Sequence, residues 1–120
     1  VKLLGDAGVW AEVDGPALEQ ALGHLIQNAV EACSQSVPVT VRVDNSEGAV
    51  AISIADKGVG MDGDFIRNRL FQPFASTKPG GFGIGAFEAR SLITAMGGRI
   101  SVSSRPGAGS TFIVEMPAAP

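Results

Sequence analysis

Hydrophobic positions along the chain follow two periods, and the change from one to the other marks the expected elements. Residues 9–14, "VWAEVD", indicate a short strand, and Asp14 can cap a following helix that has Pro16 in its first turn. From about residue 16 to 35, apolar side chains recur at the spacing of one helix face. This stripe contains Leu18, Ala21, Leu22, Leu25, Ile26, Ala29, Ala32 and Cys33.

The polar side of this predicted helix carries three residues of interest. At ~100° per residue, Asn28 falls at the edge of the apolar stripe, beside Ala21. His24 and Glu31 lie one turn before and one turn after Asn28. The helix is therefore expected to present Asn28 at the border between core and solvent.

Alternation of apolar and polar residues governs most of the remaining chain. Residues 37–56 alternate on both sides of Asn45-Ser46-Glu47-Gly48, which predicts a hairpin whose second strand ends at Asp56. Residues 64–74, "DFIRNRLFQPF", indicate a short helix and a turn. Residues 75–85, "ASTKPGGFGIG", are too rich in glycine and proline for regular structure and predict a mobile loop.

The C-terminal third predicts a helix and a second hairpin. "AFEARSLITAMGG" reads as a helix closed by Gly97-Gly98, and residues 99–117 read as strand, turn and strand. No internal repeat or linker divides residues 1–120, so a single domain is expected. Antiparallel hairpins separated by helices favour an α+β, two-layer α/β sandwich, with a mainly antiparallel sheet covered by helices on one face, over a parallel doubly wound sheet.

Composition narrows the class of protein. The 120 residues are 45% hydrophobic and 18% charged with a net charge of −3, which fits one domain with its own core and argues against a nucleic-acid partner. No apolar run approaches the ~20 residues of a membrane span and no signal segment opens the chain, so a soluble piece without direct membrane contact is expected. The single cysteine, Cys33, excludes an internal disulfide and a cysteine-built zinc site, and it is interpreted as a small buried thiol in a reducing cytoplasm.

A glycine motif follows the strand that ends at Asp56. In "DKGVGMDGDF", Gly58, Gly60 and Gly63 satisfy the dinucleotide fingerprint G-x-G-x-x-G. That fingerprint requires a crossover helix and a parallel strand, whereas a short helix and a glycine-rich loop follow here. A P-loop is also excluded, because neither Gly-Lys-Ser nor Gly-Lys-Thr occurs.

Polar and glycine-rich blocks occur in a fixed order: "HLIQNAVEA" (24–32), "DKGVG" (56–60), "FQPF" with "STKPGGFGIGAF" (71–74, 76–87) and "GAGSTF" (107–112). This order resembles the ATP-binding catalytic domain of sensor histidine kinases, the Bergerat (GHKL) fold shared with gyrase, Hsp90 and the MutL family. The blocks look like its N, G1, F, G2 and G3 boxes, and the resemblance covers about residues 9 to 117. "GGFGIGAFEARSLI" looks most like the nitrogen-regulation type or the exopolysaccharide-associated (PrsK-like) type.

The resemblance implies a role for the residues around Asp56. A carboxylate at a strand end can accept a hydrogen bond from the exocyclic amine of adenine, and glycines such as Gly58 and Gly60 let a flat base approach the backbone. Met61 would pack on the base. The alternatives are a turn or helix cap for Asp56 and a plain core position for Met61.

The resemblance also implies a metal and phosphate site. Asn28 would bind Mg²⁺, a hard ion that prefers oxygen ligands and is usually shared with substrate phosphates. Glycine amides at the start of a helix, with Lys78, would hold the phosphates of ATP under a lid hinged by Phe71 and Phe74. The remaining nucleotide contacts would come from Phe74, Thr77, Lys78, Gly81, Gly83, Ile84 and Gly85, and from Ser110 or Thr111, of which Ser110 has the more usual spacing.

Three positions depart from the family pattern. His24 stands where ATP-hydrolysing relatives carry a water-activating glutamate, which points to phosphoryl transfer, with His24 orienting phosphate or water beside Asn28 and Lys78. Glu31 stands where many kinases carry a cation, so no phosphate-binding cation is expected from this helix. Ala86 replaces a commoner leucine, and an effect on packing only is expected.

The expected function is transfer of the γ-phosphate of Mg-ATP to a histidine on a separate dimerisation domain of the same protein, with a response regulator downstream. His24, the only histidine, is expected in the pocket wall and not as the acceptor. The domain is expected in the cytoplasm, either alone or as part of a membrane-bound sensor. Two alternatives stay open: a serine kinase of the same fold acting on an anti-sigma system, and a nucleotide-binding regulatory module without turnover.

Overall fold

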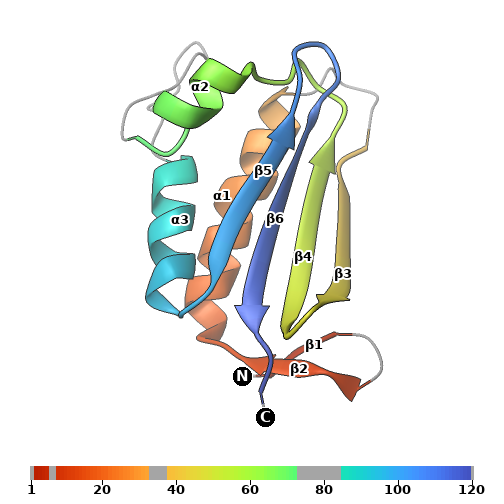
Figure 1. The fold of residues 1–120 in the computed structure, drawn as a ribbon, viewed down its shortest axis with the longest axis vertical. Coiled ribbons are helices and arrows are strands. Elements are labelled where there is room, and N and C mark those ends of the chain that lie inside the picture. Colours follow the sequence, from red (N-terminus) through yellow and green to blue (C-terminus); the bar gives the residue numbers. More distant parts are fainter. Residues whose placement is uncertain (1, 6–7, 33–37, 73–84, 120) are drawn as a thin grey trace.

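The computed structural model describes residues 2–5, 8–32, 38–72 and 85–119. These residues form a small two-stranded sheet, a four-stranded sheet and three helices, of which the first connects the two sheets (Figure 1). In chain order the elements are β1 (Lys2–Leu4), β2 (Trp10–Glu12), α1 (Gly15–Ala32), β3 (Thr40–Ser46), β4 (Ala49–Asp56), α2 (Gly63–Asn68), α3 (Gly85–Ala95), β5 (Arg99–Ser104) and β6 (Ser110–Pro117).

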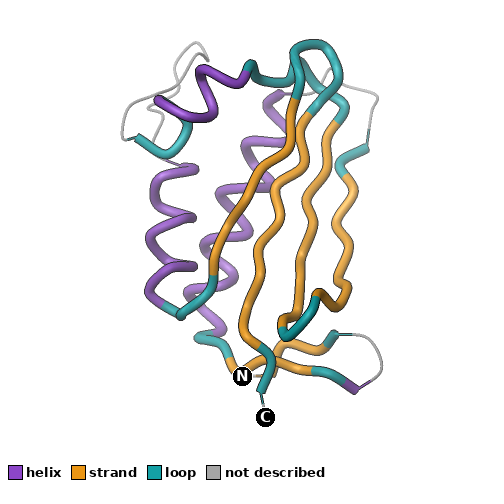
Figure 2. Tube along the Cα trace, viewed as in Figure 1, coloured by secondary structure: helices purple, strands orange, loops and turns teal. Residues whose placement is uncertain are grey.

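The large sheet is antiparallel throughout, in the order β3-β4-β6-β5. Helices α1 and α3 pack against each other and form one layer on one face of this sheet, α1 against β4 and α3 against β5 (Figure 2). The predicted α+β, two-layer sandwich with a mainly antiparallel sheet is therefore confirmed.

The core lies between the helix layer and the sheet. Its largest fully buried side chains are Leu25 of α1, Ile93 of α3, Val50, Ile52 and Ile54 of β4, and Val114 and Met116 of β6. Alternate residues of β4 and β6 point to the helices, as the period of two requires. Full burial of one such side chain contributes about 1.5–3 kcal/mol to folding, so these few residues hold the two layers together.

The helix ends follow the predicted signals. Asp14 Oδ1 accepts a hydrogen bond from the backbone N–H of Ala17 at 3.1 Å and so caps α1. At the end of α3, Gly97 has φ = 81° and its N–H donates to the Thr94 carbonyl, while the N–H of Gly98 donates to the Ile93 carbonyl. This pair of bonds closes a helix in a Schellman motif, which needs a residue that tolerates a positive φ.

Some predicted boundaries were wrong. Strand β2 covers only Trp10–Glu12, and β1, which the sequence pattern did not reveal, pairs with it in antiparallel fashion. Strand β3 continues through Asn45 and Ser46, so the turn is shorter than expected. The predicted end of the first helix and nearly all of the loop 75–85 lie outside the described residues, but Gly85 already belongs to α3.

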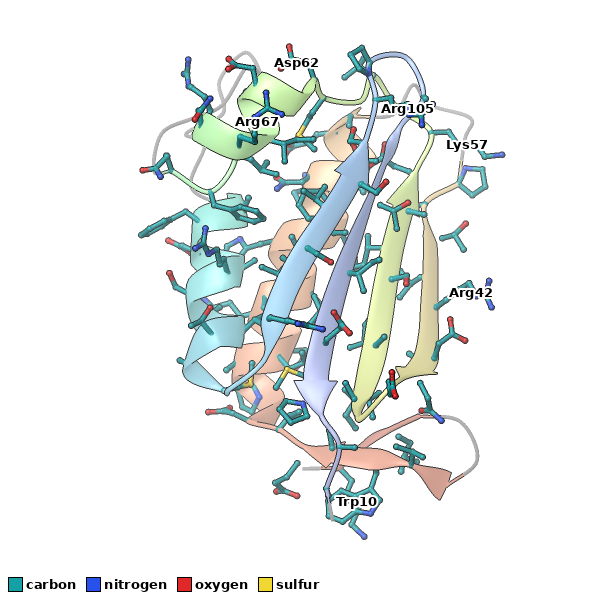
Figure 3. All side chains as sticks on the ribbon, in the orientation of Figure 1. Trp10, Arg42, Lys57, Asp62, Arg67 and Arg105 are labelled. Atoms are coloured by element: carbon teal, nitrogen blue, oxygen red, sulfur yellow. The ribbon has the colours of Figure 1, made fainter. Side chains whose placement is uncertain are left out.

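The two ends of the sheet differ in character (Figure 3). Lys57 and Arg105 lie at the end of the sheet near α2, which contains Arg67 and is capped by Asp62. Trp10 lies at the opposite end together with both chain termini. Within the described ranges, no helix combines the length and the hydrophobicity that a membrane span requires. The candidate site lies at the α2 end.

Candidate functional site

Three polar side chains form a row across the large sheet, facing the helix layer. Asp56 at the end of β4 pairs with Ser110 at the start of β6, and Ser110 pairs with Ser104 at the end of β5. Asp56 and Ser110 are only 7% and 6% exposed. Thr111 is displaced to the other face of the sheet by the alternation along β6, so Ser110 is the hydroxyl that lies beside Asp56.

The two oxygens of Asp56 have different surroundings. Oδ1 accepts a hydrogen bond from the backbone N–H of Gly58 at 2.9 Å, so the carboxylate does cap the turn that follows β4. Among the described residues, no hydrogen bond is made to Oδ2. One oxygen therefore has a structural partner, and the other is available to a donor from outside the chain.

Ser104 is a site residue that sequence reasoning missed. Its Oγ accepts from the Met61 N–H at 2.8 Å, donates to the Gly109 carbonyl at 2.9 Å and lies 2.7 Å from Ser110 Oγ. The Met61 side chain is half-buried and packs against the core, so its backbone and its side chain both help to fix this loop. A serine at the end of an otherwise ordinary strand gives no local signal of this role.

Gly58 and Gly60 are required by the protein's own backbone. A Cβ on Gly58 would collide with the Ala32 carbonyl at the end of α1, and a Cβ on Gly60, which has φ = 70°, would collide with the Arg105 carbonyl. The Val59 N–H also donates to the Ala32 carbonyl at 3.3 Å. These glycines let the loop after β4 pack between α1 and the β5–β6 turn. This structural role is independent of any approach of a ligand to their backbone.

Asn28 and His24 of α1 both face the start of α3. A Cβ added to Gly85 would lie 3.3 Å from Asn28 Oδ1, so the Asn28 side chain lies directly against the first residue of α3. One turn earlier, His24 Nε2 is 2.9 Å from Glu88 Oε2. The two atoms are close enough for an ion pair, but their geometry does not meet the criteria of a hydrogen bond. His24 Nε2 itself is buried.

A cavity of ≈ 320 Å³ opens at this end of the sheet, which is at the small end of the range for ligand pockets. Asp56, Ser104 and Ser110 contribute to its wall together with the turn between β5 and β6. The full lining is Asp56, Ser103, Ser104, Arg105, Ala108, Gly109, Ser110 and Thr111, so the cavity lies at the ends of β4, β5 and β6 and includes residues from both faces of the sheet.

Part of the predicted site cannot be placed. Phe74, Thr77, Lys78, Gly81, Gly83 and Ile84 lie outside the described residues. Of the predicted hinge, Phe71 is described: its ring meets that of Phe112 edge-on with centroids 6.5 Å apart, and Arg90 lies 5.2 Å over it. The structure thus brings Asn28, Asp56 and Ser110 to the same end of the domain, and most of the segment between α2 and α3 lies outside the described residues.

Comparison with known proteins identifies the family. Residues 13–120 match the model of the family described as "Histidine kinase-, DNA gyrase B-, and HSP90-like ATPase". The C4-dicarboxylate transport sensor protein DctB of Rhizobium meliloti is 39% identical over 101 residues, covering 82% of this chain and 16% of the relative. The sensor protein FixL of Bradyrhizobium diazoefficiens is 38% identical over 109 residues, covering 88% and 21%.

Solved structures agree with this assignment. Full-length ShkA in complex with AMPPNP superposes with a TM-score of 0.79 at 32% identity, covering 93% of this chain and 23% of that one. The mycobacterial sensor histidine kinase MprB has a TM-score of 0.82 and covers 93% and 77%, but at 21% identity it supports the fold alone. The chain spans a fifth or less of DctB and about a fifth of FixL. It belongs to the histidine kinase-, DNA gyrase B- and HSP90-like ATPase family, as an ATP-binding domain of the kind found in sensor histidine kinases.

Proposed function

We propose that this chain binds Mg-ATP and transfers its γ-phosphate to a histidine on a separate dimerisation domain of the same protein, from which a response regulator receives it. One observation supports the proposal above all. Asp56 is buried at the end of a core strand, with one oxygen bonded to the Gly58 N–H and the other without a partner among the described residues. Asp56 also lines the cavity, so this second oxygen can accept a hydrogen bond from a donor group of a ligand that enters it.

The adenine amine is the proposed donor to Asp56. Ser110 lies beside Asp56 in the same cross-strand row and Met61 lies in the following loop, so both are proposed to contact the base. Gly58 and Gly60 hold that loop in place. The structure of ShkA, which matches 93% of the present chain, has been solved in complex with AMPPNP.

Asn28 is the proposed Mg²⁺ ligand. Its side-chain oxygen lies at the start of α3, and the described residues contain no cluster of three His, Cys, Asp or Glu side chains that could hold a metal by themselves. A single amide oxygen suits Mg²⁺, which retains several waters and shares the phosphates of its nucleotide. When bound, the ion would neutralise phosphate charge; Asn28 would supply one oxygen ligand.

The phosphates are proposed to lie between Asn28 and the N-terminus of α3. The first amides of a helix are free to donate, and the helix dipole favours an anion there. Gly85 begins α3 directly opposite Asn28. Thr77, Lys78, Gly81, Gly83 and Ile84 precede it in sequence and are proposed to complete the phosphate site, with Phe74 at the hinge of the lid.

Catalysis by this domain is proposed to consist of positioning and charge neutralisation. Lys78 would supply a positive charge. His24 Nε2 is turned to Glu88, so His24 would orient phosphate or water through Nδ1. The same contact argues against His24 as the phosphate acceptor, because its Nε2 is buried between α1 and α3. The acceptor histidine is therefore proposed to lie outside this chain, and the cytoplasm, where ATP is available, is the proposed location.

The test is transfer of labelled phosphate between two purified parts. The chain is incubated with γ-labelled Mg-ATP alone and then with a dimerisation domain that carries the acceptor histidine. Acid-labile label is expected only in the second mixture and only on the added domain. Label on His24 without the partner would contradict the proposed acceptor. Binding of Mg-ATP without transfer to any such domain would favour a regulatory module, and acid-stable label on a serine protein would favour the serine kinase.

A further inference from the structure

The Ser104 hydroxyl makes three close polar contacts at the end of β5. Two of them fix their own direction: the Met61 N–H can only donate and the Gly109 carbonyl can only accept. The third, at 2.7 Å to Ser110 Oγ, could run either way on distance alone. The direction of this third bond decides what the Ser110 hydroxyl can offer to the cavity.

The composition of a hydroxyl group settles that direction. A serine has one proton to donate and two lone pairs that accept. The Ser104 proton is used on the Gly109 carbonyl and one lone pair is used by the Met61 N–H, which leaves a single lone pair. The bond between the two serines therefore runs from the Ser110 hydroxyl to Ser104 Oγ, and Ser104 is saturated.

Ser110 is thereby converted into an acceptor. Its only proton points to Ser104, so it presents lone pairs alone beside Asp56, its cross-strand partner on β4. An ionised carboxylate also only accepts. Two buried acceptors side by side favour a ligand group with two N–H donors, and they disfavour a carbonyl oxygen at the same place.

We propose that Ser104 is a positioning residue that sets nucleotide specificity: by holding the proton of Ser110, it makes the base-reading end of the pocket accept an exocyclic amine and reject a carbonyl. This proposal rests on the proposed function, in which Asp56 reads the amine of adenine. The ligand class is an aminopurine nucleotide, distinguished from a 6-oxopurine nucleotide.

Ser104 also holds two loops in register. It connects Met61, in the loop after β4, to Gly109, in the β5–β6 turn, and the Gly107 N–H donates to the Val59 carbonyl at 2.7 Å between the same two segments. A purely structural role would therefore weaken binding of every nucleotide. The specificity role predicts a change in the ratio of two nucleotides, so the two roles give different results.

The test measures dissociation constants of ATP and inosine triphosphate, which carries a carbonyl oxygen in place of the amine, for the purified chain. In Ser104→Ala, the Ser110 proton is released and can donate to the carbonyl. The preference for ATP over inosine triphosphate should fall about 5- to 10-fold, the effect of one neutral hydrogen bond. Ser101→Ala, on the exposed face of the same strand, should leave the preference unchanged.

A double-mutant cycle with Ser110→Ala makes the test specific. In the Ser110→Ala background, Ser104→Ala should leave the preference unchanged, because no proton remains to be redirected. An equal loss for both nucleotides in both backgrounds would overturn the proposal and leave Ser104 with a structural role only. A wild-type chain that binds neither nucleotide would instead contradict the proposed function.

The dissociation constants of Ser110→Ala alone give a second test, which does not depend on whether Ser104→Ala folds. If Ser110 only accepts, its removal should weaken ATP about 5- to 10-fold and leave inosine triphosphate unchanged or bound more tightly. Equal weakening of both nucleotides would show that Ser110 does not distinguish the amine from the carbonyl, which would overturn the proposal.

Discussion

His24 Nε2 of α1 lies 2.9 Å from Glu88 Oε2 in the first turn of α3, and so joins the two helices of the covering layer next to Asn28. The His24 and Glu88 side chains are 28% and 40% exposed, so solvent weakens their attraction. The contact nevertheless places a polar link one turn from the residue that we propose to bind the metal.

This link predicts a measurable coupling between the two helices. In a double-mutant cycle with His24→Ala and Glu88→Gln, the free energy of unfolding should show a coupling of about 0.3–1 kcal/mol. Urea unfolding of the four proteins measures it. Glu19→Gln, at an exposed position of α1, is the control and should not couple to His24→Ala. Additive losses would show that the two side chains do not support each other.

The separate tasks of the two Asp56 oxygens predict a loss of binding without a loss of fold. In Asp56→Asn, the amide oxygen can still accept from the Gly58 N–H, while the amide N–H₂ turns a donor towards the adenine amine. A hydrogen bond to a charged group contributes roughly 1.5–3 kcal/mol, so ATP should bind at least ~10- to 100-fold more weakly in calorimetry. The unfolding midpoint should change little.

The matched control for that experiment is Asp44→Asn, the same chemical change on β3, where the carboxylate is exposed and 3.7 Å from Arg42. It should leave ATP binding unchanged. Unchanged ATP affinity in Asp56→Asn would contradict the proposed role of Asp56 in binding the adenine base.

Asn28→Ala should reduce magnesium-dependent binding of ATP more than metal-free binding of ADP, because the residue is proposed to contact the ion that bridges the phosphates. Titrations of both nucleotides with and without Mg²⁺ measure the difference. Gln20→Ala, at an exposed position of the same helix, controls for changes in the helix itself. Equal losses with and without Mg²⁺ would indicate that Asn28 acts on the fold or on the base.

Gly60→Ala should destabilise the fold itself. The substitution combines an unfavourable positive φ with a collision against the Arg105 carbonyl, and a loss of about 2–4 kcal/mol is expected. Gly48→Ala is the control because Gly48 has nearly the same φ, 71° against 70°, but open space around it, and it should lose only about 1 kcal/mol. Similar losses in urea unfolding would show that the loop yields to the added methyl group.

The sequence predicted most of the fold because most of its signals are local. The spacing of Leu18, Leu25 and Ala29 predicts one face of α1, and alternation predicts the strands of the large sheet. Strand β1 was missed because three residues, "KLL", are too few to show a period of two. The chemistry around Asp56 was predicted from its position after a buried strand and from the resemblance to a known family.

The contacts that the sequence could not predict join residues that are distant along the chain. Met61 and Ser104 are separated by 43 positions, and nothing in the local pattern around either one indicates the other. His24 and Glu88 meet only because α1 and α3 pack side by side. Such contacts depend on the packed arrangement of whole elements, which residue periodicity does not contain.

The collisions that a side chain would cause at Gly58 and Gly60 have a consequence for how relatives of this domain diverge. Both glycines are demanded by the backbone of α1 and of the β5–β6 turn, so selection for folding alone would retain them. Oδ2 of Asp56, in contrast, makes no hydrogen bond to the described residues that would stabilise the fold. A descendant that stopped using nucleotides would be expected to keep its glycine motif and to drift first at Asp56, so this aspartate reports present activity better than the glycines beside it.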